Sequence, residues 1–306
     1  MDNRDKDIYE TDDPDESEYL GSDEAVEAQL DFGGLFSSRF TNVKHLYTSP
    51  SGPTEIYTAT RYGKRYVLKG LKEQFRNDPI YNLALAKEFE IGISLDHPNI
   101  RRTLGLESVD GIGKVIVLEY IDGQTLDSLM VSGSLSVSRA RAIAEQTAAA
   151  LGYIHGKQVF HRDLKPSNII VSHMGDVVKI IDFNLSDSED FIILKNPAGS
   201  RRYMAPEQLS PGARPSAVAD IYSFGVILGE LAAVNGDEEL SAAAEKCTDG
   251  NPARRPQSVA SVRLPASHPT AVQTLSNFLS SRVLTYVMLC ICLALAAVDA
   301  FMLISD

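Results

Sequence analysis

Residues 161–168 read HRDLKPSN, and this stretch decides the fold. It brings an aspartate (Asp163), a lysine (Lys165) and an asparagine (Asn168) into one short segment. Phosphoryl transfer needs a carboxylate at the nucleophile, a cation on the phosphates and oxygen ligands for Mg²⁺. A solvated surface loop has no need for that combination, so the segment predicts a catalytic loop.

Two further segments follow in the chain, DFN at 182–184 and APE at 205–207. In their order and spacing, the three segments resemble those of eukaryotic-type protein kinases, and the resemblance covers residues 40–264. It implies an α+β, bilobal protein kinase fold with a small β-rich N-lobe and a helical C-lobe. The expected lobes are 40–121 and 122–264.

The resemblance implies a role for each charged residue of these segments. Asp163 accepts or orients the proton of the substrate hydroxyl, and Lys165 steadies the transferred phosphate. Asn168 and Asp182 hold Mg²⁺. Lys165 and the SRRYMAPE segment resemble the serine/threonine branch of the family, so the expected acceptor is a Ser or Thr of a cytoplasmic protein.

ATP is the other expected cofactor, bound between the lobes. By resemblance, Lys69 contacts the α and β phosphates and pairs with Glu88, Leu118 is the gatekeeper beside the adenine, and four more residues contribute to the nucleotide site: Ile56, Val67, Glu119 and Ile121. Two structural contacts are also implied. Asp220 anchors the catalytic loop, and Arg255 pairs with Glu207.

The glycine-rich loop of the family is altered in this chain. Ser49, Ser51 and Thr54 stand at the positions of its glycines, and Gly52 lies between two prolines. Loss of the glycines predicts a weaker clamp on the phosphates, because glycine lets backbone amides approach them closely. Gly92 stands four residues after Glu88, where the family carries a bulky side chain, and predicts a gap that loosens this helix.

Local patterns predict several elements directly. The strands TEIYTAT and RYVLKG, separated by residues 61–64, predict a hairpin. Asp78 and Pro79 predict the start of a helix that covers residues 80–95. Further helices are expected over residues 138–155 and 221–233.

Charge is distributed unevenly along the chain of 306 residues, whose net charge is −12. Residues 1–31 hold most of this excess, because their dense Asp and Glu face only Arg4 and Lys6. We interpret residues 1–39 as an acidic disordered tail. The remainder is nearly balanced, which disfavours nucleic acid as a partner.

Residues 283–304 form an apolar run that contains one charged residue, Asp299. A helix of this length spans roughly 30 Å, enough to cross a bilayer. The run predicts a single-pass transmembrane helix, joined to the kinase domain by a tether over 265–281. Arg263 and Arg282 lie on its N-terminal side, which predicts a cytoplasmic kinase domain. A buried terminal helix is the alternative.

Other functions remain open at this stage. A pseudokinase would keep the fold and recruit a partner without phosphotransfer, which the altered glycine-rich loop and Gly92 favour. A membrane-anchored scaffold would use the acidic tail to capture a basic partner, and a small-molecule kinase would use the same site on another acceptor. The joint presence of the charged residues favours the protein kinase. Substrate, activating signal and oligomeric state do not follow from the sequence.

Overall fold

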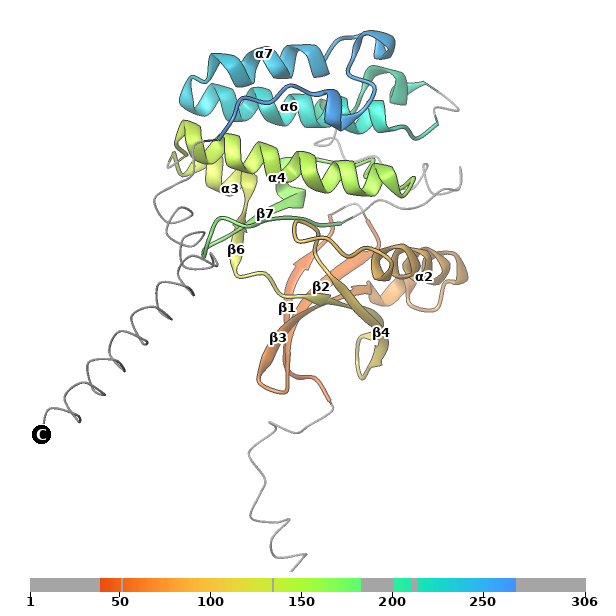
Figure 1. Cartoon of the computed structure of the whole chain (residues 1–306). Helices are drawn as coiled ribbons and strands as arrows, with labels where there is room; N and C mark the ends of the chain where they lie inside the picture. Colours follow the sequence, from red (N-terminus) through yellow and green to blue (C-terminus); the bar gives the residue numbers. More distant parts are fainter. Residues whose placement is uncertain (1–38, 51, 134, 183–200, 211–213, 268–306) are drawn as a thin grey trace, which may run out of the picture.

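The computed structural model describes residues 39–50, 52–133, 135–182, 201–210 and 214–267. A β-rich lobe packs against a helical lobe (Figure 1), so the expected α+β bilobal architecture is confirmed. Nearly all of the predicted acidic tail, most of the tether and the whole predicted membrane helix lie outside the described residues.

The N-lobe is built on a five-stranded antiparallel sheet with the strand order β1-β2-β3-β5-β4. Its strands are β1 (Thr41–Thr48), β2 (Thr54–Arg61), β3 (Lys64–Leu71), β4 (Thr103–Val109) and β5 (Gly113–Glu119), and the short helix η1 (Glu73–Phe75) follows β3. The expected hairpin joins β2 to β3. Tyr62 and Gly63 have φ values of 51° and 71°, which give the two-residue turn that suits the twist of paired strands.

Helix α2 (Pro79–Ile93) is the helix of the N-lobe and lies beside β4 in Figure 1. Its start follows the expected signal, because the Asp78 carboxylate accepts a hydrogen bond from the Ile80 amide at 2.8 Å. Pro79 occupies the first turn, where its missing N–H is not needed. These contacts fix the N-terminal end of the helix that carries Glu88.

The C-lobe stacks helices α4, α6 and α7 in layers, with a small sheet of order β6-β7-β8 between them and the N-lobe (Figure 1). Its helices are α3 (Leu126–Val131), α4 (Val137–Gly156), α6 (Ala217–Asn235) and α7 (Glu238–Cys247), and its strands are β6 (Gly123–Thr125), β7 (Ile169–Ser172) and β8 (Val178–Ile180). Short helices connect them: η2 (Pro166–Asn168), η3 (Arg201–Tyr203), η4 (Pro206–Leu209), η5 (Pro252–Arg254) and η6 (Val259–Ser261).

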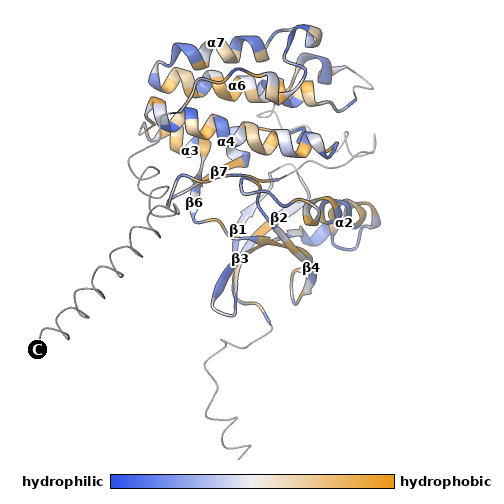
Figure 2. Ribbon diagram, viewed as in Figure 1, coloured by the Kyte–Doolittle hydropathy of each residue, from blue (hydrophilic) through white to orange (hydrophobic). Residues whose placement is uncertain are grey.

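Helix α6 is central to the core of this lobe. Phe224 and Leu228 are fully buried and pack in one cluster with Leu151 and Ile154 of α4. Figure 2 shows hydrophobic residues along α6, and among the described helices it alone is long and apolar enough to cross a membrane. Because over half of its most apolar stretch is buried inside the protein, it serves as a core helix.

Candidate active site

Two predicted site residues, Lys165 and Asn168, converge on Asp163. Lys165 Nζ donates to Asp163 Oδ2 at 2.8 Å. Asn168 Nδ2 donates to the Asp163 carbonyl oxygen at 2.8 Å and approaches Oδ2 at 3.3 Å. The helix η2 turns the chain so that Asn168 lies against Asp163. The segment that decides the fold therefore closes on itself around one carboxylate.

Asp220 of α6 anchors this loop from below. Its carboxylate accepts the amide hydrogens of His161 at 2.7 Å and Arg162 at 2.8 Å, so the contact expected from the sequence is present. Arg162 has a φ of 65°, in the left-handed region that costs a side-chain-bearing residue about 1–2 kcal/mol. The buried carboxylate holds the backbone in that conformation.

His161 packs under the loop and is fully buried. Its Nε2 lies 3.1 Å from the carbonyl oxygen of Ile181, and because a carbonyl can only accept, this nitrogen carries the proton. Burial outweighs the nearby Asp220 and Asp163 carboxylates and lowers the pKa of His161. The neutral ring links the catalytic loop to the segment that ends at Asp182.

Asn168 and Asp182 lie on adjoining segments. The Ile181 amide donates to the Asn168 carbonyl oxygen at 2.9 Å, which places Asp182 next to the catalytic loop. One carboxylate and one amide oxygen form a donor set that suits Mg²⁺, which takes oxygen ligands and keeps water and phosphate in its other positions. The two residues fit the metal that the sequence predicts.

Lys69 connects the two lobes. Its Nζ lies 2.5 Å from Glu88 Oε1 of α2 and 3.3 Å from Asp182 Oδ1, so the predicted pair with Glu88 is present. Burial by itself would lower the pKa of Lys69, but the Asp182 and Glu88 carboxylates outweigh it and raise the pKa. Lys69 is therefore a fixed cation between Glu88 and Asp182.

Arg101 is a second buried cation at this place, which the sequence analysis did not identify. Its Nη2 donates to Asp182 Oδ1 at 3.0 Å, on the oxygen that Lys69 also contacts. No pattern around Arg101 marks it out, since it lies between the Ile100 bridge to β8 and the start of β4. Its burial depends on side chains far away in the sequence.

The expected gap at Gly92 is absent. A Cβ built at position 92 would overlap the Thr103 side-chain oxygen of β4, so the two elements already touch there. The space that remains is a cavity of about 20 Å³, large enough for one water molecule. Its lining includes Glu88, Arg101 and Asp182. The missing side chain lets α2 lie directly against β4 at this point.

The residues predicted around the adenine gather in one cluster. Val67, Leu118 and the partly buried Ile56 pack together across β2, β3 and β5. The Glu119 side chain instead accepts from Lys179 Nζ of β8 at 3.0 Å. The same carboxylate accepts from the Arg102 amide at 3.1 Å, and Ile121 lies in the connection between β5 and β6.

The altered glycine-rich loop forms a closed turn. The Ser49 amide donates to the Thr54 carbonyl oxygen at 3.0 Å, and the Gly52 amide donates to Ser49 Oγ at 2.9 Å. Pro50 and Pro53 have no amide hydrogen to offer. An incoming phosphate must therefore compete with a side chain of the protein for the Gly52 amide.

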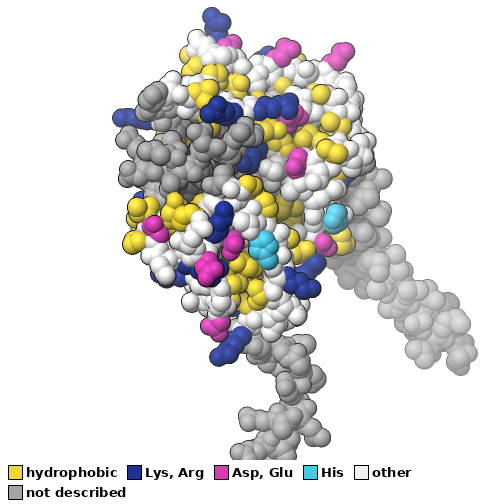
Figure 3. Space-filling model, turned by 180° about the vertical axis from the view of Figure 1, so that it is seen from behind, with side chains coloured by type: hydrophobic (Ala, Val, Ile, Leu, Met, Phe, Trp, Pro, Cys, Tyr) yellow, Lys and Arg dark blue, Asp and Glu magenta, His cyan; other side chains and the backbone are white. Residues whose placement is uncertain are grey.

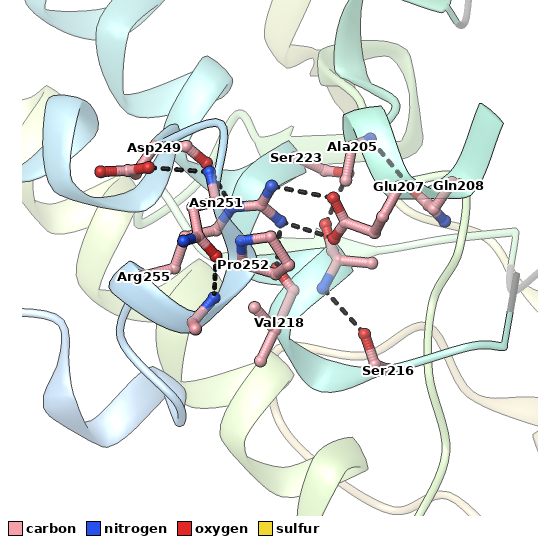
Figure 4. A network of polar contacts seen from close by, with 12 residues as sticks. Ala205, Glu207, Gln208, Ser216, Val218, Ser223, Asp249, Asn251, Pro252 and Arg255 are labelled. Atoms are coloured by element: carbon pink, nitrogen blue, oxygen red, sulfur yellow. Dashed lines mark hydrogen bonds and ion pairs between the residues drawn. The ribbon is translucent and has the colours of Figure 1, made fainter. Parts of the chain in front are cut away.

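An ion pair fixes the short helix η4, which carries Glu207. Arg255 donates to both carboxylate oxygens of Glu207, at 2.6 and 2.8 Å, and Figure 4 shows the two side chains directed at each other. The Arg255 side chain is fully buried. Despite the effect of burial, its hydrogen bonds lower the pKa of Glu207. The pair expected from the sequence is present.

Comparison with protein families places this site in a known context. A family model described as the protein kinase domain matches residues 52–282. Among curated proteins, the chain is 32% identical over 218 residues to the serine/threonine-protein kinase PrkC of Bacillus subtilis, a match that covers 67% of this chain and 33% of PrkC. It is also 32% identical over 203 residues to the serine/threonine-protein kinase PknA of Mycobacterium tuberculosis, covering 64% of this chain and 47% of PknA.

Solved structures agree with these sequence matches. The crystal structure of the Mycobacterium tuberculosis PknI kinase domain superposes with a TM-score of 0.56 at 25% identity. That match covers 72% of this chain and 92% of the PknI chain. The chain spans about a third to a half of the length of the curated relatives named above.

Proposed function

The chain belongs to the protein kinase domain family, and on that premise we propose that it transfers the γ-phosphoryl group of ATP to Ser or Thr residues of proteins. The ion pairs from Glu88 through Lys69 to Asp182 carry the proposal, because they place a fixed cation beside the oxygen ligands. A protein that only bound partners would have no need to keep this set beside Asp163 and Lys165.

The proposed roles follow from the chemistry of each group. Asp163 accepts the proton of the acceptor hydroxyl, and Lys165, held at 2.8 Å from it, offsets the charge that builds on the transferred phosphate. Lys69 orients the other phosphates. Mg²⁺, held by Asn168 and Asp182, would neutralise charge on the phosphate oxygens.

Asp163→Asn tests the assignment. We expect phosphate transfer from labelled ATP to a generic protein acceptor to fall by about 10²–10⁴-fold, as for loss of a general base. Asp176→Asn is the matched control, because Asp176, like Asp163, pairs with a basic side chain (Arg139, 2.7 Å) but lies on the β7–β8 turn. Equal activity in the wild type and in Asp163→Asn would refute the role of Asp163. Phosphoamino-acid analysis of the product tests the Ser/Thr acceptor.

A pseudokinase is the second candidate, and the engaged Gly52 amide favours it. If the folded wild type transfers no phosphate and does not bind ATP with Mg²⁺, this reading replaces the first. Partner capture would then be compared between the full chain and a variant without residues 1–31, since an acidic scaffold would lose its partner on that deletion.

We also propose that residues 283–304 tether the kinase domain to a membrane from the cytoplasmic side. The apolar run and the arginines before it support the proposal. Deletion of residues 283–306 should move the protein from the membrane fraction to the soluble fraction. Retention of the shortened chain in the membrane fraction would refute it.

Protein rather than nucleic acid remains the proposed class of partner. On the face seen in Figure 3, Lys and Arg side chains are interspersed with Asp and Glu, without a continuous basic patch among the described residues of that face. Such a surface suits a protein substrate more than a polyanion.

A further inference from the structure

Arg101 is buried next to Lys69 and Asp182, and it contacts Asp182 of the proposed metal site. Its exposure is only 9%, and its guanidinium donates to Asp182 Oδ1 at 3.0 Å. Its backbone amide donates to the Ile180 carbonyl oxygen at 3.0 Å, which sets the residue against β8. A charge this buried is retained only where it is paired.

Arg101 lies beside the place where α2 packs on β4. Gly92 and Thr103 touch, and the cavity of about 20 Å³ beside them has Arg101 and Asp182 in its wall. A larger side chain at position 92 would collide with β4, and beside this close contact the guanidinium donates to Asp182. Helix α2 is linked to Asp182 through charged groups, because Glu88 of α2 pairs with Lys69 and Lys69 pairs with Asp182.

Four charged groups balance at this point. Glu88 and Asp182 are the two acids, and Lys69 and Arg101 are the two bases. Without Arg101, the set would carry one net negative charge, which would attract a divalent cation more strongly. With Arg101, Asp182 is held by two cations that share Oδ1, at 3.3 and 3.0 Å.

We propose that Arg101 is a positioning residue that fixes the Asp182 carboxylate and offsets its charge. The carboxylate is then held in one orientation, and the site binds Mg²⁺ less tightly than it would without Arg101. The metal part of this inference rests on the proposed kinase function. The pairing of Arg101 with Asp182 does not, so the two parts can be tested separately.

The first test compares the full-length wild type with Arg101→Met and Arg101→Lys. In Arg101→Met we expect kcat to fall about tenfold, since the carboxylate loses a partner, while the Mg²⁺ concentration for half-maximal activity falls about threefold or more, since a competing cation is gone. Arg101→Lys should restore the Mg²⁺ requirement because it keeps the charge. The neighbouring exposed Arg102 supplies the control, Arg102→Met, which should change either quantity by less than about twofold.

A merely structural role predicts a different pattern. Loss of folded protein would lower kcat and leave the Mg²⁺ requirement unchanged, and that result would overturn the proposal. An increased Mg²⁺ requirement in Arg101→Met would overturn it as well.

The second test needs neither nucleotide nor metal. Unfolding equilibria are measured for the wild type, Arg101→Met, Asp182→Asn and the double variant. If the two residues did not interact, the fold-change in the unfolding constant of the double variant would equal the product of the fold-changes of the single variants. We expect it to be smaller than that product by a factor of at least about five. A wild type without phosphotransfer would refute the proposed function, and the inference would then be judged on this cycle alone. Coupling below about twofold would overturn it.

Discussion

Asp220 joins three parts of the C-lobe through one carboxylate. Besides the amides of His161 and Arg162, it pairs with His155 Nε2 of α4 at 2.9 Å, and its own exposure is 1%. A single buried residue thus links two core helices to the catalytic loop. The loop keeps its left-handed Arg162 because this acceptor is present.

Asp220→Ala should lower the free energy of unfolding by about 3–5 kcal/mol, because it leaves buried donors without an acceptor. The measurement is urea denaturation followed by circular dichroism. Asp127→Ala, an exposed aspartate in the first turn of α3, serves as the control and should cost less than about 1 kcal/mol. Similar losses in the two variants would contradict the anchoring role.

Some of the site residues could be predicted from the sequence, and others could not. Lys69, Glu88 and Asp163 could be placed because short segments with fixed spacing carry them. Arg101 could not, because its partners, the Asp182 carboxylate and the Ile180 carbonyl oxygen, lie about 80 residues further along the chain. Thr103 of β4 also occupies the space expected to be a gap at Gly92, and a strand that is distant in the sequence pattern could not be placed there in advance.

Among the elements, the β1–β2 turn has an internal hydrogen bond whose effect on nucleotide binding can be measured. Ser49→Ala removes the hydroxyl that accepts from the Gly52 amide. This frees an N–H for phosphate, so we expect the Kd for a fluorescent ATP analogue to fall about threefold, the effect of roughly one modest hydrogen bond. Thr41→Ala, at the far end of β1, should leave the Kd unchanged. An unchanged or higher Kd in Ser49→Ala would show that the Gly52 amide does not reach the nucleotide.

The start of α7 depends on an ion pair with α4. Asp237 caps the helix by accepting from the Leu240 amide at 3.2 Å, and Arg141 donates to both of its oxygens at 2.7 and 2.9 Å. The hydrogen bond from Arg141 is the main cause of the lowered pKa of Asp237. A lowered folded-state pKa means that this stabilisation is present above the unfolded pKa of about 4 and is lost as the pH falls through the folded value.

Asp237→Asn keeps a good capping residue and removes the charge. We expect it to lower the free energy of unfolding by about 2 kcal/mol at pH 7, and by less as the pH falls below about 4. Glu239→Gln is the control, because its carboxylate also contacts Arg141 but is 70% exposed. A difference that stays constant from pH 7 to pH 3 would show that the charge is not the cause.

Elements fixed by local signals followed the sequence closely. The Tyr62-Gly63 turn and the Asp78 cap depend on neighbours within a few residues, so hairpin and helix could be predicted. Helix α6 begins earlier and ends later than the expected 221–233, because the Ser216 cap and the left-handed Gly236 set its ends.

Across the whole molecule, the edge strand β1 and the core helix α6 differ most clearly in how deeply they are buried. All eight residues of β1 are exposed at the edge of the sheet, whereas α6 has residues with no exposure at all. We expect amides of α6 to exchange hydrogen only through global unfolding, and those of β1 to exchange fastest among the described strands, in native-state exchange followed by mass spectrometry. Faster exchange in α6 than in β1 would contradict this order of stability.

The closed junction between Gly92 and Thr103 also has a pharmacological consequence. A ligand that extends past Leu118, which the resemblance to protein kinases places beside the adenine, needs room next to Gly92 and Thr103. The cavity there is about 20 Å³, enough for one water molecule rather than for an aromatic ring. We therefore expect compounds that fill only the adenine site to bind this protein more tightly than compounds that carry an additional aromatic group beyond Leu118. A selectivity panel could therefore separate this kinase domain from relatives with an open rear pocket.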